Sequence, residues 1–514
     1  MGNPFARDLI LLHSPAIYDF RTTHTFLGPV ADAVPSTTMF EMYPVGLTSI
    51  ASFLESNNYN VEIVNLAYRM LRDPGFDVEA HLRHMSAPVF GIDLHWLPHV
   101  QGALAIMELV KRLHPESRIL VGGLSASYYH EELVRYPFVD FVLRGDSTEE
   151  PVRQLLQALR ESTPLERIEN LTWKRPDGSI AVNRLTFVPA DLDYVDVPAY
   201  RYLLRSLFKY RSLGNLVPCL EWLRYPVTLL ITARGCTQNC AICGGSRSAY
   251  QSICSRQRPA FRSPEKLAED VRVISSFSRA PIFVVHDPRM GGMRRARRFF
   301  SLLEEMRPAN EMVFELFYPA DDELFELVSR SVPTWSIEMT LESPDEVHRR
   351  RNGKFPHSNA AVESTIGSAL AHGCRKLDVF FMVGLPDQRC EDALGIVGPF
   401  DTGSASARRC CAAWPPGWRW KSATPSLGSA AATTSLRPAA AATAHRGGPW
   451  RYHRSTIPAA VPERLTILPV PDSPARTHER HALPWIRRPG NVEARRHERW
   501  GPERCTWDPA FSEM

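Results

Sequence analysis

Three cysteines lie close together on one short loop, which directly follows an apolar run. Cys236, Cys240 and Cys243 have the spacing C-x3-C-x2-C. Three thiolates at this spacing can bind three irons of a [4Fe–4S] cluster and leave the fourth iron open to a ligand. Zinc is the alternative, but structural zinc usually takes two pairs of ligands, and no second pair lies near this loop in the sequence. The spacing favours the cluster, and Cys254, the nearest other thiol, is expected to be a buried bystander.

The loop resembles the defining motif of the radical S-adenosylmethionine (radical SAM) superfamily. In that family the open iron binds the amine and carboxylate of S-adenosylmethionine (SAM), and an electron from the cluster splits SAM to give a 5′-deoxyadenosyl radical. Ile242 stands where many members have an aromatic residue before the third cysteine. The resemblance implies SAM beside the cluster, with Gly244 and Gly245 among its contacts.

In the part of the chain that begins at Val227 and contains the cysteine loop, strand-like apolar runs alternate with amphipathic helical stretches. Repeated βα units of this length build barrels whose active sites lie at the carboxyl ends of the strands. Five units are visible, and the resemblance implies a partial (β/α)6 TIM-like barrel. The expected strands are Val227–Ala233, Ile282–His286, Val313–Phe317, Trp335–Leu341 and Leu377–Val383, and the expected helices are Pro264–Ser276, Arg294–Glu305, Asp322–Ser329 and Asn359–His372.

Polar residues follow the expected strands of the barrel. His286, Asp287 and Arg289 end the second strand, where the radical SAM family binds the amino group of SAM. Glu338 and Glu342 lie on and just past the fourth strand, where relatives hold the ribose hydroxyls or the amino acid. Carboxylates suit that task because they accept two hydrogen bonds. The resemblance therefore implies SAM contacts for all five residues.

A Gly-Leu-Pro segment follows the fifth expected strand. It resembles the GLPG loop that lies beside the adenine of SAM in the family, so Gly384 and Leu385 are predicted SAM contacts. Asp387 replaces the second glycine, and Asp adopts a positive φ less readily than Gly.

The segment Arg349–Asn359 is strongly basic. It could face an anionic substrate, but we expect a solvated loop, because runs of charge usually lie in water.

The first 160 residues also alternate between strands and helices, which predicts a parallel sheet with helices on both faces. Ligands of such sheets bind beyond the carboxyl ends of the strands. The expected strands are Leu9–His13, Val61–Leu66, Val89–Leu94, Arg118–Val121 and Phe138–Leu143, and the expected helices are Val45–Glu55, His99–Leu113, Tyr129–Tyr136 and Glu149–Arg160.

Two strand-end loops of this region resemble those of the cobalamin-binding domain that precedes many radical SAM cores. A Gly-Gly pair, Gly122 and Gly123, follows the fourth strand, and Gly145 enters an acidic helix start after the fifth. Glycines let a backbone approach a ligand closely, although a tight turn would need the same residues. The resemblance implies cobalamin contacts at these glycines and at Ser125.

The segment from Asp93 to Pro98 is similar to the D-x-H-x-x-G motif that supplies a histidine to cobalt in other cobalamin enzymes. It ends in Pro98 where the motif has Gly, and it follows the third strand where the motif follows the first. Radical SAM relatives typically lack that histidine. We therefore expect Asp93 and His95 near the cofactor, with an ordinary packed histidine as the alternative for His95.

These patterns predict an α/β chain of several domains, in keeping with its 514 residues. A Rossmann-like, cobalamin-type parallel sheet is expected first, then a hairpin with a Pro-Asp-Gly turn, then the partial barrel and an irregular tail. The expected boundaries are 1–162 for the cobalamin-binding domain, 163–222 for the hairpin and connector, 223–398 for the radical SAM core and 399–514 for the tail.

The tail has an unusual composition. Residues 401–514 hold one lysine against sixteen arginines, and seven of the eleven tryptophans of the chain. Disordered tails avoid tryptophan, and no helical or strand period lasts beyond a few residues here. Our hypothesis is a reading-frame error near residues 388–402, which would leave the barrel incomplete.

Composition excludes few classes of protein. A net charge of +4 gives no indication of nucleic acid or membrane binding. The first residues lack the pattern of a signal peptide, and prolines and charges interrupt the longest nearly apolar run, Leu213–Ala233, so no membrane span is expected. The ten cysteines are clustered rather than spaced as a disulfide framework, which indicates a reducing cytoplasm.

The resemblance as a whole implies a cobalamin-dependent radical SAM enzyme that acts on a small-molecule substrate. The expected reaction is methylation of an unactivated carbon, with a reductant such as flavodoxin or ferredoxin as the protein partner. Radical cyclisation or rearrangement is the near alternative. A non-catalytic cobalamin or iron–sulfur sensor and a defective gene product are alternatives of another class. The substrate itself follows from no motif.

Overall fold

The computed structural model describes residues 6–22, 41, 44–196, 198–219, 222–223, 226–382 and 385–388, and the backbone of 418–422 and 431–438. No helix in this described part of the chain is long and apolar enough to cross a membrane.

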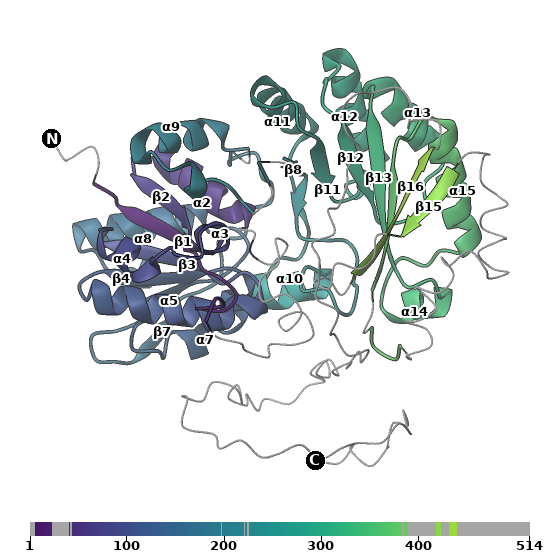
Figure 1. The fold of residues 1–514 in the computed structure, drawn as a ribbon. Helices are drawn as coiled ribbons and strands as arrows, with labels where there is room; N and C mark the ends of the chain where they lie inside the picture. The colour runs from purple at the N-terminus through teal and green to yellow at the C-terminus, as the bar shows by residue number, and fades with distance from the viewer. Residues whose placement is uncertain are drawn as a thin grey trace, which may run out of the picture. The chain divides into compact units, whose positions relative to one another are not determined.

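The first part of the chain builds a seven-stranded sheet in the order β2-β1-β3-β4-β5-β6-β7. Its first five strands are parallel, which confirms the predicted Rossmann-like sheet. Figure 1 shows α2 and α9 on one side of these strands and α5 on the other. The five parallel strands are β1 (Leu9–His13), β2 (Val61–Asn65), β3 (Val89–Asp93), β4 (Arg118–Gly122) and β5 (Phe141–Leu143).

Each face of this sheet has its own hydrophobic core. Side chains alternate along a strand, so Leu9 and Leu11 of β1 lie in one core while Ile10 and Leu12 lie in the other. Burial on both faces explains why these strands read as continuous apolar runs. The helices of one face are α2 (Val45–Ser56), α8 (Glu149–Glu161) and α9 (Tyr200–Tyr210), and those of the other are α3 (Leu66–Arg72), α4 (Val78–Arg83), α5 (Val100–Leu113), α6 (Leu124–Tyr128) and α7 (His130–Leu133).

Short helices were the elements that periodicity could not predict. Helices α3 and α4 have seven and six residues, too few to display a helical period. The helix expected over Tyr129–Tyr136 is shortened to the four-residue α7, and the five-residue α6, which was not predicted, begins directly after the Gly-Gly pair. The strand expected from Phe138 begins at Phe141.

The predicted hairpin is present, and its turn closes through a hydrogen bond from the Gly178 N–H to the Arg175 carbonyl oxygen at 2.9 Å. Its first strand pairs antiparallel with β5, so the hairpin extends the N-terminal sheet. The sheet therefore continues past residue 162, the expected end of the first domain. The two strands are β6 (Leu171–Lys174) and β7 (Ile180–Val182).

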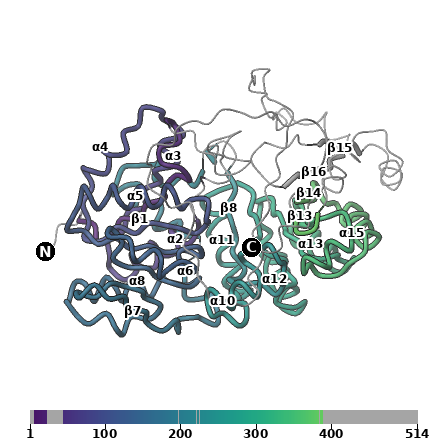
Figure 2. The backbone as a smooth tube through the Cα atoms, turned by 90° about the horizontal axis from the view of Figure 1, so that it is seen from below, coloured from purple at the N-terminus to yellow at the C-terminus, as the bar shows by residue number. Residues whose placement is uncertain are grey.

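The second sheet contains five parallel strands in the order β14-β13-β12-β11-β8. Figure 2 shows α11, α12, α13 and α15 following one another along it. One hydrophobic core joins these helices to alternate residues of the strands. The strands are β8 (Thr228–Ile231), β11 (Ile282–Val285), β12 (Met312–Leu316), β13 (Trp335–Glu342) and β14 (Leu377–Met382), and the helices are α11 (Pro264–Phe277), α12 (Met293–Met306), α13 (Asp322–Ser331), α14 (Glu346–Arg351) and α15 (Asn359–Ala371).

The tail contributes two further strands to this sheet. β16 (Ala431–Pro438) pairs antiparallel with β14, and β15 (Trp418–Ser422) pairs antiparallel with β16. The expectation of an irregular tail is therefore wrong for these two stretches. A sixth βα unit would instead have added a parallel strand at this edge.

Candidate functional site

The three cysteines lie on a loop between two small elements that the sequence did not indicate. β9 (Ala233–Arg234) leads into the loop and α10 (Arg247–Cys254) follows it. Ser246 caps α10 by accepting a hydrogen bond from the Ala249 N–H at 3.3 Å. The Arg247 N–H donates back to the Gln238 carbonyl oxygen at 2.8 Å, which closes the loop on itself.

The thiols of this loop differ in exposure but share one kind of contact. Cys240 is buried, Cys236 is half-buried and Cys243 is exposed, and none of them forms a disulfide. Backbone N–H groups of Gln238 and Gly245 donate to the sulfurs of Cys236 and Cys243 at 3.3 and 3.4 Å. Such donors stabilise a thiolate, and hydrogen bonds of this kind accompany iron–sulfur clusters.

Burial raises the pKa of the Cys236 thiol and raises that of Cys240 to about 12. A metal or cluster that binds here must therefore displace protons. Cys254 is fully buried, as expected for a thiol outside the binding loop.

The spacing of the sulfur atoms bears on the choice between zinc and a cluster. Four ligands at about 2.3 Å around one zinc would place the sulfurs within about 4 Å of one another. Among the residues that the structure describes, His13, Asp93 and His99 are the one group of three ligand-type side chains whose ligand atoms all lie within 4.8 Å. The three cysteine sulfurs, all in the described part of the chain, do not all lie within 4.8 Å of one another, so at least one pair is wider than a single zinc ion would hold.

The basic segment Arg349–Asn359, which begins in the last turn of α14, packs against the cysteine loop. The Ala241 N–H donates to the Asn352 carbonyl oxygen at 2.8 Å. Lys354 is buried and lies 3.5 Å from a carboxylate oxygen of Glu342. Arg349 is fully buried and donates to the Ser343 carbonyl oxygen at 2.9 Å. The expectation of a solvated loop is therefore wrong for these residues, because their polar groups are paired inside the protein.

Asp287 and Arg289, both predicted to contact SAM, are paired with each other. The Arg289 guanidinium donates to both Asp287 oxygens at 2.9 and 2.7 Å, and also to the carbonyl oxygens of Tyr318 and Pro319. The Phe317 N–H donates to Asp287 at 3.0 Å. These contacts hold the loop after β11 to the loop after β12. This structural role accounts for the presence of Asp287 and Arg289 without a bound ligand. Contact with SAM stays a prediction for them.

His286 lies at the end of β11 with a φ of 72°, a left-handed conformation that non-glycine residues rarely adopt. Its N–H donates to a Glu315 carboxylate oxygen at 2.8 Å. Burial lowers the pKa of the His286 ring to about 4, so the ring is neutral at physiological pH. Strain of this kind at a strand end is typical of functional sites, which supports the prediction for this residue.

Three carboxylates form a row across neighbouring strands, because Glu315 pairs in register with Glu338, and Glu338 with Asp378. The row lies on the face of the sheet opposite the helix-covered core. Burial, together with the neighbouring Asp378 carboxylate, raises the pKa of Glu338 to about 7. Asp378 is itself paired with Lys376. Glu338 can therefore donate or accept a hydrogen bond near neutral pH, as contact with a ribose hydroxyl requires.

The remaining predicted SAM contacts lie at two loops. No atom lies within 4 Å of the position that a Cβ on Gly244 would take, so the backbone there is open to a ligand. Leu385 is buried, and its N–H donates to the Gln388 side chain at 3.2 Å. Asp387 does adopt a positive φ, of 59°, where the family has glycine. Gly384 lies outside the described residues.

The Gly-Gly loop after β4 is packed against the loop after β3. A Cβ on Gly123 would stand 2.6 Å from the Leu94 carbonyl carbon, and its φ is 118°, so only glycine fits there. The His95 carbonyl oxygen accepts hydrogen bonds from the N–H and hydroxyl of Ser125 at 3.2 and 3.0 Å. At Gly122 the nearest atom to a Cβ position is 3.9 Å away, which leaves this glycine free to approach a ligand.

The loop after β5 joins the same edge of the sheet. The Gly145 N–H donates to the Ser127 hydroxyl at 2.9 Å. Burial lowers the pKa of His95, so this imidazole is neutral and has the protonation state of a metal ligand. The structure thus brings together the predicted cobalamin contacts of three strand-end loops, at the edge where parallel sheets bind ligands.

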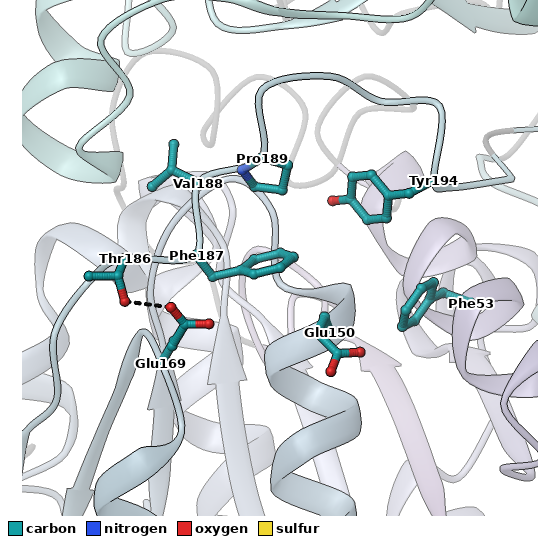
Figure 3. A pocket seen from close by; sticks show the side chains of 8 residues that line it. All are labelled: Phe53, Glu150, Glu169, Thr186, Phe187, Val188, Pro189 and Tyr194. Atoms are coloured by element: carbon teal, nitrogen blue, oxygen red, sulfur yellow. Dashed lines mark hydrogen bonds between the residues drawn. The ribbon is translucent and has the colours of Figure 1, made fainter.

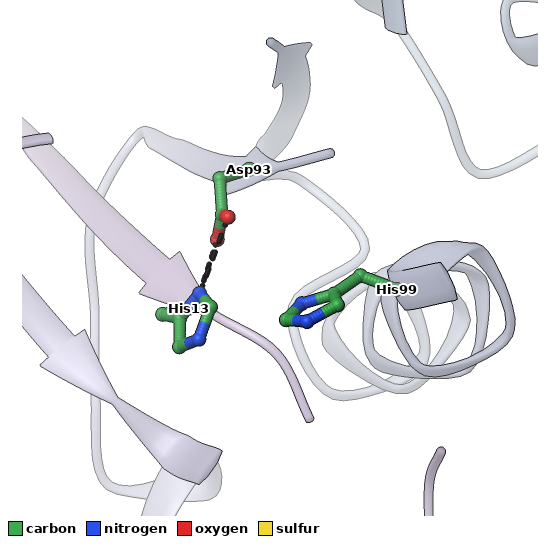
Figure 4. Close-up of side chains that lie close together, drawn as sticks. All are labelled: His13, Asp93 and His99. Atoms are coloured by element: carbon green, nitrogen blue, oxygen red, sulfur yellow. Dashed lines mark hydrogen bonds and ion pairs between the residues drawn. The ribbon is translucent and has the colours of Figure 1, made fainter. Parts of the chain in front are cut away.

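A buried polar cluster at this edge was not predicted from the sequence. His13 ends β1, Asp93 ends β3 and His99 directly precedes α5, and Figure 4 shows the two imidazoles and the carboxylate facing one another. The His13 Nδ1 lies 3.0 Å from Asp93 Oδ1. Burial alone would lower the pKa of His13, but the interactions with Asp93 and Glu41 have the larger combined effect and raise this pKa. The only signal in the sequence was that His13 is polar and ends an apolar strand.

An open pocket of about 520 Å³ lies elsewhere, between α2, the start of α8 and the connector after the hairpin (Figure 3). It contains none of the predicted site residues. Its two carboxylates are already used, because Glu150 pairs with Arg153 and Glu169 accepts a hydrogen bond from Thr186. We assign no function to this pocket.

Comparison with known families decides the identity of the two sheets. Residues 33–155 match the B12 binding domain, and residues 230–397 match the Radical SAM superfamily. The chain therefore carries one segment that matches the B12 binding domain and one that matches the Radical SAM superfamily. The matches confirm the predicted fold class, the predicted cofactors ([4Fe–4S] cluster, SAM and cobalamin) and the assignment to radical SAM enzymes. The radical SAM match ends at residue 397, where the strand–helix pattern of the sequence also ends.

Proteins with sequences similar to this chain include methyltransferases. The cytidylyl-2-hydroxyethylphosphonate methyltransferase of Streptomyces wedmorensis is 21% identical over 68% of this chain and 72% of its own length. The hopanoid C-3 methylase of Methylococcus capsulatus is 26% identical over 48% of this chain and 42% of its own length. The chain therefore spans less than half of that second relative.

A solved structure shares the arrangement of both sheets. The radical S-adenosylmethionine methyltransferase TsrM of Kitasatospora setae, solved with tryptophan substrate and a SAM analog, superposes with a TM-score of 0.55. The two sequences are 16% identical, and the match covers 76% of this chain and 71% of TsrM. At this identity the likeness shows the fold.

Proposed function

We propose that this protein is a cobalamin-dependent radical SAM methyltransferase that methylates an unactivated carbon of a small molecule. The observation that carries the proposal is the loop with Cys236, Cys240 and Cys243, whose free thiols follow a B12 binding domain in the same chain. When bound, the cluster with SAM supplies radical hydrogen abstraction and cobalamin supplies a methyl group, so the protein itself must bind, orient and exclude water.

The cysteine loop fits a cluster in three respects. Its three sulfurs do not all lie within 4.8 Å of one another, backbone N–H groups donate to two of them, and no disulfide engages them. The buried Lys354 lies near the thiols and favours their charged form. A cationic side chain of this kind would offset the negative charge of thiolates held at low dielectric.

The SAM site is proposed at the carboxyl ends of the barrel strands next to this loop. His286, Glu338 and Glu342 offer a neutral imidazole and two carboxylates, and Gly244 leaves the backbone accessible. Leu385 would pack against the adenine. Burial raises the pKa of Glu315 and Glu338, so these carboxyl groups can accept or donate hydrogen bonds to the polar groups of SAM.

The cobalamin site is proposed at the edge formed by the loops after β3, β4 and β5. His95, Gly122, Gly123, Ser125 and Gly145 would line it. His13 and Asp93 form a buried hydrogen-bonded pair beneath this edge and would keep its loops in place.

The first experiment is anaerobic reconstitution with iron, sulfide and hydroxocobalamin, followed by measurement of iron, sulfide, cobalt and zinc per chain. About four irons and about one cobalt per chain are expected. Zinc without iron would overturn the assignment of the cysteines. Iron without cobalt would keep radical chemistry and remove methyl transfer.

The second experiment separates an enzyme from a sensor. The reconstituted protein is reduced by flavodoxin or ferredoxin and incubated with SAM, and 5′-deoxyadenosine is measured. Formation of 5′-deoxyadenosine in the wild type and its loss in Cys240→Ala are expected. Intact cofactors without any SAM cleavage would contradict the proposal and favour a sensor.

A further inference from the structure

Two arginines bracket the cysteine loop, one on each side along the chain. Arg234 is the last residue of β9 and stands two positions before Cys236, and Arg256 follows α10. Both side chains reach the turn after β5 of the B12 binding domain, where they meet two acidic residues of the helix start that the sequence had linked to cobalamin.

Glu149, the first residue of α8, is the partner of Arg234. Only 1% of its side chain is exposed, and the Arg234 guanidinium donates to both of its oxygens, at 2.5 and 3.1 Å. The Ser49 hydroxyl donates at 2.7 Å and the Tyr194 hydroxyl at 3.1 Å. One buried carboxylate therefore collects groups from α2, the connector and the cysteine region. Arg234 also donates to the Ser147 hydroxyl at 3.1 Å.

Asp146 is the partner of Arg256, and both side chains are almost completely buried. The Arg256 guanidinium binds the carboxylate with two of its nitrogens, one of them at 2.9 Å. A third nitrogen donates to the Pro189 carbonyl oxygen of the connector at 2.8 Å. This two-pronged geometry is the strongest form of an arginine–carboxylate contact, because both hydrogen bonds are charge-assisted and parallel.

The chain between the two arginines is shaped to keep both contacts. Gly235 has a φ of 93°, and a Cβ there would stand 2.9 Å from the Arg256 side chain and 3.2 Å from Pro259. Only glycine therefore lets Arg256 cross the start of the loop on its way to Asp146. Helix α10, which lies between the loop and Arg256, packs against α6, the helix that begins at the Gly-Gly loop.

We propose that Arg234 and Arg256, with Glu149 and Asp146, form a clamp that fixes the cysteine loop against the strand-end loops of the B12 binding domain. These four are positioning residues. At most 16% of any of the four side chains is exposed, none needs to touch a cofactor, and together they tie both ends of the loop to a single turn. The clamp would set the separation of the two cofactor sites, and this part of the inference rests on the proposed function.

The clamp accounts for the acidic helix start better than direct contact with cobalamin does. Every carboxylate oxygen of Asp146 and Glu149 already accepts a hydrogen bond from an arginine. Moving either carboxylate to a ligand would leave a buried guanidinium without its counter-ion, which is strongly unfavourable. Gly145 takes no part in the clamp, because its N–H donates to the Ser127 hydroxyl. It therefore stays a predicted cobalamin contact.

Hydrogen exchange in the cofactor-free full-length chain tests the clamp without relying on any cofactor. The variants are Glu149→Gln and Asp146→Asn, with Glu150→Gln as the matched control, because Glu150 pairs only within α8 with Arg153 and Gln154. In both test variants, peptides that cover residues 228–262 should exchange at least about tenfold faster, while peptides of β1–β4 and the control variant stay at the wild-type rate.

Two results would overturn the clamp. One is amide hydrogen exchange of residues 228–262 in Glu149→Gln and Asp146→Asn that is no faster than in the Glu150→Gln control. The other is an equal rise in β1–β4, which would mean a general loss of stability. If either test variant fails to fold, Arg234→Lys and Arg256→Lys keep the charge and lose the two-pronged contact, and a smaller rise confined to residues 228–262 is expected.

The holo-protein tests what the clamp is for. Pulsed electron paramagnetic resonance between the reduced cluster and cob(II)alamin should give one narrow distance in the wild type and a broader distribution in Glu149→Gln, at equal iron and cobalt content. An unchanged distribution would overturn the role in cofactor separation. If the wild type binds no cobalt, the proposed function fails, and the exchange result still decides whether the clamp exists.

Discussion

Gly353 lies directly against the Asn239 carbonyl oxygen, so closely that a Cβ on Gly353 would stand 2.2 Å from it. The φ of Gly353 is 76°, which a residue with a side chain rarely adopts. This contact joins the basic segment after α14 to the middle of the cysteine loop, between Cys236 and Cys240. A stretch that the sequence predicted to be a solvated loop therefore helps to support the cysteine loop.

Gly353→Ala should therefore displace the cysteine loop without unfolding the barrel. We expect the iron bound after reconstitution to fall by at least about half, because backbone must move to remove the clash. Iron per chain and the visible absorption of the cluster measure this. Gly367→Ala is the control, because no atom lies within 4 Å of the Cβ position in α15. Equal iron in both variants would contradict the supporting role.

The three loop thiols and the nearby buried thiol should behave differently on removal. Single changes of Cys236, Cys240 or Cys243 to Ala should abolish stable cluster binding, because three ligands are the fewest that hold such a cluster open at one iron. Cys254→Ala should keep the full iron content, since Cys254 is buried outside the loop. Iron and sulfide analysis checks both. Loss of the cluster in Cys254→Ala alone would require a different ligand set.

Stability should depend on pH through Glu338. Burial and the neighbouring Asp378 carboxylate raise the pKa of Glu338 from 4.5 to about 7. Between these values the folded protein holds a proton that the unfolded chain releases, so this residue makes the free energy of unfolding fall as pH rises from about 4.5 to about 7 and then level off.

Glu338→Gln should remove this slope and exceed the wild type in stability at pH 8 by about 1–3 kcal/mol. Urea unfolding at pH 5 and pH 8 measures the difference, and the exposed Glu326→Gln on α13 serves as the control. A wild type and a Glu338→Gln variant with parallel pH profiles would show that the carboxyl of Glu338 titrates normally.

Asp287 and Arg289 should matter for stability even when no SAM is present. Asp287→Asn leaves the buried Arg289 guanidinium without its counter-ion, which should cost about 3–5 kcal/mol. Chemical unfolding of the cofactor-free chain measures this cost. Glu323→Gln, which breaks an exposed pair with Arg297, should leave stability nearly unchanged. If Asp287→Asn weakened only SAM binding, these residues would be ligand contacts and not a structural pair.

Much of the fold follows from local patterns. The parallel strands of both sheets and the long helices α5, α8, α11 and α15 have apolar periods that the structure confirms within a few residues. The family matches confirm the interpretation of the two sheets as B12-binding and radical SAM, while the roles of the cysteine triplet and of the strand-end glycines stay predictions. Local patterns suffice here because buried strands and amphipathic helices carry their periods in the order of residues.

Partners distant in sequence could not be read in the same way. His13 contacts Asp93 of the neighbouring strand, 80 residues away in the sequence, and Arg234 contacts Glu149, 85 residues away. A lone polar residue at a strand end or helix start has the same local pattern whether it binds a ligand or another side chain. Only the register of the strands and the packing of the loops select the partner.

The sequence by itself predicted the chemistry of the site, because thiol spacing on a short loop is a local property. It also indicated that ligands would bind at the carboxyl ends of the strands, since the parallel direction of the strands follows from βα alternation. The tertiary structure decided which charged residues are free for a ligand and which are paired with one another. It paired Asp287, Arg289, Asp146 and Glu149 internally, because a buried charge must find a partner, and here each nearest partner comes from the chain itself.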